Sequence, residues 1–319
     1  MKPSPPVTTH PWARIASRSG WAGCTADDRR RAVAPSRDAL AATSSPRVRD
    51  VPDTLGRMDV DEYRRMADAG ERHWWYRNTR LLLAQLLVPH LEGRHRPVVL
   101  DAGGGTGATG GWMTRYGTTV LADVEPMALQ VARTDHGDER PGKPGTPGTS
   151  RVARGHGLLP VQADLNRLPF ADVSFDAVLC VTALCHRMNP DPAAIVRDFA
   201  RITKPGGVVC LMEPGVKRLW RGHDEVTHTG RRFSVGDLSE MAEEAGLTVD
   251  RATGAYSFLV PPAAILGVVE RGKQKSDVGR NESGLGGTFS ALARTERWLL
   301  RRRNLPAGLS AIVVATRPV

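Results

Sequence analysis

The sequence predicts an α/β fold built around a doubly wound parallel sheet. Short apolar runs alternate with amphipathic stretches of ten or more residues, which is the pattern of strands joined by helices. Six glycines lie between residues 103 and 111, directly after the first apolar run. In sheets of this kind, ligands bind beyond the carboxyl ends of the strands, so this turn is where we expect a site.

The elements follow in order along the 319-residue chain. Leu82, Leu83, Leu86 and Leu87 repeat at helical spacing and predict a helix running toward Pro89. Further helices are expected from the glycines through Trp112 and over 125–134, 190–203, 234–247 and 289–303. Ser234 as an N-cap and Gly246 as a stop support the fourth of these. Apolar runs predict strands over 97–101, 118–123, 158–164, 173–184, 204–214 and 309–318.

The N-terminal part differs in composition from the rest. Residues 1–57 are rich in Pro, Ser, Ala and Arg without periodicity, so we expect a disordered extension, with ordered sequence beginning at Met58. We expect a helical cap over 58–95 and one domain over 96–319. The Gly- and Pro-rich stretch at 135–157 is interpreted as a surface loop inserted into that domain.

The distribution of charge and the cysteines bear on the expected partners, metal sites and cellular compartment. The formal net charge is +10, but residues 1–57 and 271–303 account for nearly all of it, which weakens the case for a nucleic-acid partner. Cys24, Cys180, Cys185 and Cys210 form no CxxC pair and predict no metal site. Cys180 and Cys210 are interpreted as small buried apolar residues. With no export signal in the first segment, we expect a cytoplasmic protein.

The glycine turn fits two kinds of nucleotide-like ligand. Gly105 to Gly110 satisfies GxGxxG, and Asp123 ends the next strand, where it could accept a ribose hydroxyl. That pattern alone leaves an NAD-dependent Rossmann oxidoreductase open. Glycines also let a backbone approach a ligand closely at low steric cost.

The longer frame formed by Asp101, Gly103, Gly105 and Gly107 reads DxGxGxG and resembles motif I of the class I S-adenosylmethionine-dependent methyltransferases. The stretches starting at Asp164 ("DLNRLPFADVSFDAVLC") and Ile202 ("ITKPGGVVCL") are similar to later segments of that family. The resemblance implies a Rossmann-like, mostly parallel, seven-stranded sheet and S-adenosyl-L-methionine as cofactor. It implies a ribose contact for Asp123 and an adenine-amine contact for Asp164. The cofactor-binding residues implied in this way are Asp101, Gly103, Gly105, Gly107, Asp123, Asp164 and Leu165.

Two further segments resemble a bacterial subgroup of this family. One reads HWWY from His73 to Tyr76, and the other reads LWxxHDxxxHxxRRF from Leu219 to Phe233. The resemblance implies an acceptor-side insertion over about 213–233 and an acceptor that is a small molecule, a glycan or a lipid-linked molecule, with nucleic acid not expected. The candidate catalytic residues are His223, Asp224, His228 and His186.

Among these candidates His223 is the expected general base, with Asp224 or another carboxylate orienting its imidazole. The chain departs from the family at Cys185, where members often carry Glu before the residue that is His186 here. Any function of that carboxylate is expected to be absent. The alternative interpretations are a core histidine for His186 and a solvated loop for 223–233.

Other interpretations also stay open. Trp74, Trp75 and Tyr76 are either core residues or a lid over the cofactor. A nucleic-acid methyltransferase suits the charge, but "NPDP" at 189–192 matches its tetrapeptide poorly. The arginines of 289–303 suggest a membrane-surface protein, with an ordinary surface helix as the alternative. Residues 258–269 are too short to span a bilayer and could wall an acceptor pocket, so peripheral membrane contact through 258–303 is an expectation.

Overall fold

The computed structural model describes residues 67–70, 73–136, 157–220, 222–269 and 286–319. The chain divides into two units, Met1–Pro46 and Arg47–Val319, and the described residues all belong to the second unit. The expected disorder of 1–57, the expected start at Met58 and most of the inserted loop at 135–157 lie outside the described residues. The division into extension, cap and domain therefore stays a prediction.

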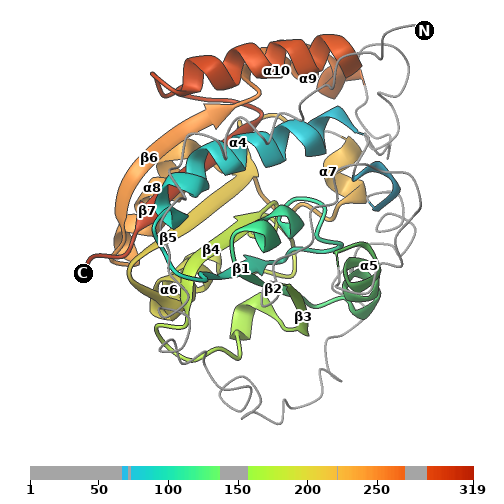
Figure 1. Ribbon diagram of the computed structural model, residues 1–319. Helices are drawn as coiled ribbons and strands as arrows, with labels where there is room; N and C mark the ends of the chain where they lie inside the picture. The colour runs from blue at the N-terminus through green and yellow to red at the C-terminus, as the bar shows by residue number, and fades with distance from the viewer. Residues whose placement is uncertain (1–66, 71–72, 137–156, 221, 270–285) are drawn as a thin grey trace, which may run out of the picture. The chain divides into compact units, whose positions relative to one another are not determined.

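The core of the described unit is one seven-stranded sheet (Figure 1). Its strands lie in the order β3-β2-β1-β4-β5-β7-β6. Their bounds are β1 Val98–Ala102, β2 Thr118–Asp123, β3 Leu158–Gln162, β4 Phe175–Val181, β5 Thr203–Pro214, β6 Thr248–Ala255 and β7 Ser310–Thr316. β1 to β5 pair in parallel, whereas β7 runs antiparallel to both β5 and β6. The Rossmann-like, mostly parallel sheet expected from the sequence is confirmed.

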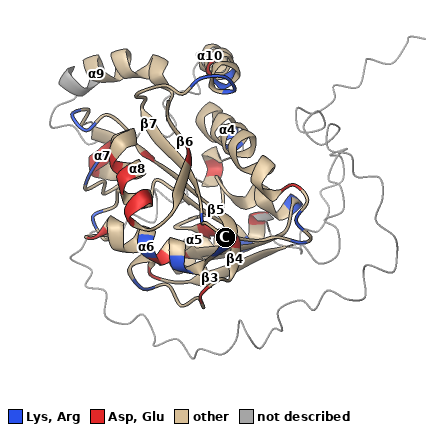
Figure 2. Ribbon diagram, turned by 90° about the vertical axis from the view of Figure 1, so that its left-hand side faces the viewer, with Lys and Arg blue, Asp and Glu red and all other residues tan. Residues whose placement is uncertain are grey.

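Helices cover both faces of this sheet (Figure 2). The helix bounds are α4 Trp74–Leu91, α5 Pro126–His136, α6 Pro192–Ile202, α7 Gly222–Val226, α8 Val235–Glu244, α9 Val260–Val269 and α10 Gly286–Leu300, with short 3₁₀ helices η3 Gly111–Arg115, η4 Leu165–Arg167 and η5 Ser257–Leu259. α6 and α8 pack on one face, while α4 covers the opposite face with α10 stacked outside it. α8 begins with the expected cap, a capping box in which Ser234 and Asp237 each accept the other's backbone N–H.

β6 and the glycine turn are two of the places where the structure differs from the expectation. No strand was predicted over β6, because Asp250 and Arg251 interrupt its apolar pattern. β6 is an edge strand of the sheet, and edge strands commonly carry charged residues. The helix expected from the glycines through Trp112 is instead an irregular turn followed by the 3₁₀ helix η3. Glycines at 107, 110 and 111 disfavour a regular helix there.

Candidate functional site

A cavity of about 460 Å³ lies beyond the carboxyl ends of β1, β2, β4 and β5. Its lining residues are far apart in the sequence, and they include the N-terminal end of α4, the glycine turn after β1, the loop after β4 and the segment around α7. Parallel strands that end at one edge bring these segments together. The cavity is therefore where the fold predicts a ligand.

The glycine turn forms one wall of the cavity. Gly103, Gly105 and Gly107 have φ angles of 69°, 54° and 78°, a backbone conformation that favours glycine. A Cβ added at Gly103 would lie 2.5 Å from the Cβ of Ala183. Gly103 and Gly105 line the cavity, whereas Gly107 lies outside its lining and shapes the turn.

Asp101 lies beneath this turn and not in the cavity lining. It is fully buried, and neither of its carboxylate oxygens has a hydrogen-bond partner among the described residues. Cβ atoms added at Gly104 and Gly110 would lie 2.5 Å and 2.1 Å from its Oδ2, so only glycine fits over it. Burial raises the pKa of Asp101 to about 7, and the negative charge of Asp123 adds to the rise.

Asp123 ends β2 and lines the cavity. Its Oδ2 accepts the backbone N–H of Gly105 at 2.8 Å, and its Oδ1 accepts that of Glu125 at 2.9 Å. These bonds fix the carboxylate beside the glycine turn. Burial raises the pKa of Asp123, and the two backbone hydrogen bonds oppose the rise.

Asp164 and Leu165 form a further part of the lining, at the start of η4. Asp164 Oδ1 accepts the backbone N–H of Asn166 at 2.9 Å and its side-chain amide at 2.8 Å. Leu165 is buried and presents an apolar side chain to the cavity. Together with Asp123 they supply acceptors and an apolar contact around one space.

The first turn of α4 forms an aromatic wall. His73, Trp74, Trp75 and Tyr76 all line the cavity, with Trp74 and Tyr76 buried. Trp74 also packs against Phe289 of α10, with ring centroids 5.3 Å apart. Trp74 and Tyr76 are therefore core residues that also wall the cavity, while a lid over a cofactor stays a prediction.

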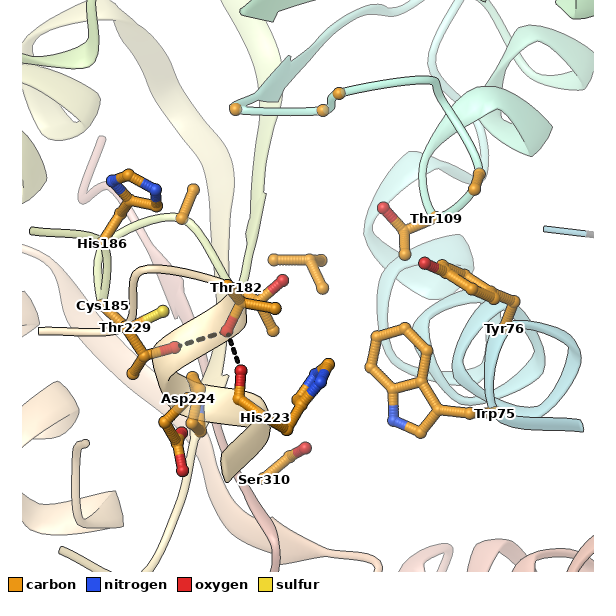
Figure 3. Close-up of a pocket in the computed structure, with 18 of the residues that line it drawn as sticks. Trp75, Tyr76, Thr109, Thr182, Cys185, His186, His223, Asp224, Thr229 and Ser310 are labelled. Carbon is orange, nitrogen blue, oxygen red and sulfur yellow. Dashed lines mark hydrogen bonds between the residues drawn. The ribbon is translucent and has the colours of Figure 1, made fainter. Parts of the chain in front are cut away.

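The segment around α7 forms the facing wall. Figure 3 shows the ring of His223 directed into the cavity, toward the side where Trp75 and Tyr76 lie. The carbonyl oxygen of His223 accepts the Thr227 hydroxyl at 2.9 Å, and the hydroxyls of Thr227 and Thr229 lie 2.9 Å apart. This segment therefore presents the imidazole of His223 to the cavity.

Behind His223, Asp224 forms a buried ion pair. Nη2 of Arg232 donates to both carboxylate oxygens of Asp224 at 2.8 Å each. The exposed fractions of the two side chains are only 6% for Arg232 and 2% for Asp224. Nη1 of Arg232 also donates to the carbonyl of Gly215 at 2.9 Å, just after β5. The pair ties α7 to the sheet.

The other two candidate histidines lie together at a second position. His186 lines the cavity, and its Nδ1 accepts the backbone N–H of Met188 at 3.2 Å. Burial lowers the pKa of His186 to about 4, with smaller contributions from His228 and Arg187. The ring of His228 is 6.0 Å away, outside the cavity lining, and its residue has a φ of 50°.

Glu213 is a buried carboxylate that the sequence interpretation missed. Its Oε1 accepts the backbone N–H groups of Ala183 and Leu184 at 3.1 and 2.9 Å, and its Oε2 accepts that of Cys185 at 3.1 Å. Burial raises its pKa to about 7. A carboxylate therefore does lie beside Cys185, although it comes from the end of β5. A lone Glu within the apolar run of β5 was the available signal.

The cysteines, the possible metal ligands and the helix lengths bear on other functions that the chain could have. Cys180, Cys185 and Cys210 are free and buried, and Cys24 lies outside the described residues. Across the described ranges, no group of three His, Cys, Asp or Glu residues could hold a metal ion. No helix in the described part of the chain is both long and apolar enough to cross a membrane.

The comparisons with known proteins agree with the fold. A family model described as a methyltransferase domain matches residues 100–211. A Mycolicibacterium smegmatis protein, named as a probable S-adenosylmethionine-dependent methyltransferase, is 30% identical over 189 residues, covering 58% of this chain and 64% of that protein. The ubiquinone biosynthesis O-methyltransferase of Xanthomonas oryzae pv. oryzae is 39% identical over 168 residues, covering 52% of this chain and 58% of that protein. The chain thus covers less than two thirds of the length of either relative.

A solved structure shows the same fold. A chain in the complex of the Haloferax volcanii Trm112 methyltransferase activator matches 83% of this chain and 100% of its own length, with a TM-score of 0.50 and 18% identity. At that identity the likeness concerns the fold alone. The residues matched by the family model contain the glycine turn and most of the segment from β1 to β5. Residues 100–211 therefore match a methyltransferase domain, and the described unit has the fold of such proteins.

Proposed function

We propose that the protein transfers a methyl group from S-adenosyl-L-methionine to a small-molecule acceptor in the cavity described above. The observation that carries this proposal is the arrangement of Asp123, Leu165 and the glycine turn around the same cavity that His223 enters. When bound, the cofactor supplies a methyl carbon already activated by its positively charged sulfur.

The residues present fit that cofactor. Gly103 and Gly105 line the cavity with positive φ angles, and a Cβ at Gly103 would collide with Ala183, so glycine is required there. Asp123 presents a fixed carboxylate to the cavity, which can accept ribose hydroxyls. Asp164 and Leu165 supply an acceptor and an apolar surface for the adenine. Asp101, which supports the turn from below, would act on the cofactor through the shape of the turn.

The aromatic wall from α4 and the opposite wall from α7 suit an acceptor that has an apolar part and a group that must be deprotonated. Trp75 and Tyr76 offer an aromatic surface, and His223 lies across the cavity from them. An imidazole is a suitable proton acceptor near neutral pH. The role of the protein is then to hold the acceptor in line, to exclude water and to remove the proton at the imidazole nitrogen. The name of the Xanthomonas relative supports an acceptor of this small-molecule class.

The arrangement around α7 revises the partner expected for His223. Both oxygens of Asp224 face Arg232, so we assign Asp224 and Arg232 to positioning α7 and keep His223 as the base. His186 and His228 are not given a proton-transfer role, because His186 accepts a backbone N–H and His228 lies outside the lining.

Calorimetry tests the cofactor assignment. We expect S-adenosylmethionine to bind and NAD not to bind. Asp123→Ala should weaken binding of S-adenosylmethionine by ~1.5–3 kcal/mol, about 10- to 150-fold, because hydrogen bonds to a charged acceptor are lost. Glu244→Ala removes an exposed carboxylate on α8, outside the cavity lining, and should leave the affinity unchanged. Binding of NAD without S-adenosylmethionine would overturn the assignment.

A labelled-methyl experiment tests the acceptor class. Methyl-labelled cofactor is supplied with fractionated cell extract, and label is followed into small molecules, lipid, glycan, protein and RNA. We expect label in an organic-soluble or small polar fraction. Label found only in RNA or protein would contradict the proposed acceptor class and favour the nucleic-acid or protein alternative.

A further inference from the structure

The outer face of α10 is both apolar and basic. Leu292 and Trp298 of α10 are 43% and 55% exposed. Arg294, Arg302 and Arg303 are exposed beside them, and the guanidinium of Arg302 lies over the Trp298 ring at 4.7 Å. Figure 2 shows this basic cluster at the end of α10.

The acidic residue of α10 does not offset these charges at the surface. Both carboxylate oxygens of Glu296 are used by backbone N–H groups, those of Tyr256 and Ser257, on the inner side of the helix. The inner side also carries Phe289, which packs on Trp74 in the cavity wall. α10 therefore separates an inner side that serves the cavity from an outer side that is cationic.

α9 continues the apolar part of this surface. Both views place α9 and α10 at the same end of the described unit. The sequence of α9 contains no charged residue, and Ile265 is 67% exposed. Pro262 is exposed and also lines the cavity, together with Leu259 and Ala263. The apolar surface of α9 is thus continuous with the cavity wall.

Combined, these features match a lipid surface better than a nucleic acid. A phosphate backbone is bound by cations and hydrogen-bond donors, whereas the exposed side chains of Ile265, Leu292 and Trp298 add an apolar surface that suits a lipid layer. Tryptophan flanked by arginine is typical of side chains at the boundary between lipid headgroups and acyl chains. Arginines close to such a boundary are attracted to anionic headgroups.

We propose that the outer faces of α9 and α10 dock on a membrane containing anionic lipid. An apolar acceptor held in that membrane then enters the cavity past Pro262. The entry of the acceptor rests on the proposed function, whereas docking itself does not. The inference refines the acceptor to a lipophilic small molecule.

Vesicle flotation of the full chain tests the docking surface. One vesicle is phosphatidylcholine alone and the other contains equal parts of phosphatidylcholine and phosphatidylglycerol. We expect flotation with the anionic vesicles and its loss at high salt. Replacing Arg294, Arg302 and Arg303 together by Ala should weaken partitioning on the order of 100-fold, since each cation near the surface contributes attraction. Trp298→Ala should weaken it several-fold.

A matched control removes the same charge elsewhere. Replacing Arg29, Arg30 and Arg31 by Ala lowers the net charge equally and should leave flotation intact. Flotation lost in this control, absence of flotation with anionic vesicles, or binding to RNA in place of vesicles would each overturn the docking surface. Calorimetry with S-adenosylmethionine, run on the same samples, reports the proposed function separately, so the two failures are distinguishable.

Discussion

Arg232 donates to both carboxylate oxygens of Asp224, the residue after His223, in a buried ion pair with 2.8 Å for each contact. The second nitrogen of the same guanidinium reaches the carbonyl of Gly215 at the end of β5. One arginine therefore joins α7, which carries His223, to the sheet that carries the glycine turn. This relationship explains how a helix of only five residues can hold an imidazole at a fixed place.

Removing Arg232 should damage both stability and turnover. Arg232→Met leaves the buried carboxylate of Asp224 without its guanidinium, and breaking a buried pair in this way costs about 3–5 kcal/mol. We expect a loss of that size in urea unfolding, together with a lower kcat and little change in affinity for S-adenosylmethionine. The exposed pair of Arg187 and Glu225 lies in the same region, at 2.9 Å, and supplies the control. Arg187→Ala should cost less than about 1 kcal/mol. Equal losses in the two variants would contradict the anchoring role.

Asp101 should make the protein less stable as the pH rises from about 4 to about 7. Its pKa is raised from 3.8 to about 7 in the fold, so the folded state holds a proton that the unfolded state has released. Asp101→Asn removes this proton linkage without changing the shape of the side chain. We expect its free energy of unfolding to depend less on pH over that window, by up to about 4 kcal/mol. Urea unfolding at a series of pH values measures the slope, and parallel curves for the two proteins would contradict the assignment.

Much of the fold could be predicted from local sequence pattern. Alternating apolar runs and amphipathic stretches indicated β1 to β5 and β7, and the Ser234 cap marked the start of α8. β6 was missed because an edge strand receives its register from β7 and not from its own apolar pattern. The glycine run was recognised, but its conformation depends on Asp101 lying under it, which is a tertiary relationship.

The candidate site was harder to predict, because its polar contacts join residues that are far apart in the sequence. Sequence adjacency suggested that Asp224 orients His223, whereas the donation from Arg232 to both oxygens of Asp224 could not be predicted from the sequence. Glu213 was missed because a buried carboxylate is identified by the N–H groups around it, and these belong to the loop after β4. Motifs thus located the cavity, while its polar connections required the structure.

His223 should be required for turnover and not for cofactor binding. It enters the cavity opposite Trp75 and Tyr76, where an acceptor would meet it. If its imidazole removes the acceptor proton, His223→Ala should lower kcat by ~10²- to 10⁴-fold. The rate is measured as transfer of labelled methyl to the acceptor fraction identified with the wild-type protein, and affinity for S-adenosylmethionine is measured by calorimetry.

His186→Ala is the matched control, since it removes another cavity-lining imidazole whose Nδ1 accepts a backbone N–H, and it should retain most of the rate. Added imidazole should restore part of the activity of His223→Ala, which loss of a merely structural side chain would not allow. A His223→Ala enzyme that is less stable but turns over at the wild-type rate would show that His223 is not the general base. The assignment of the cofactor would not be affected by that result.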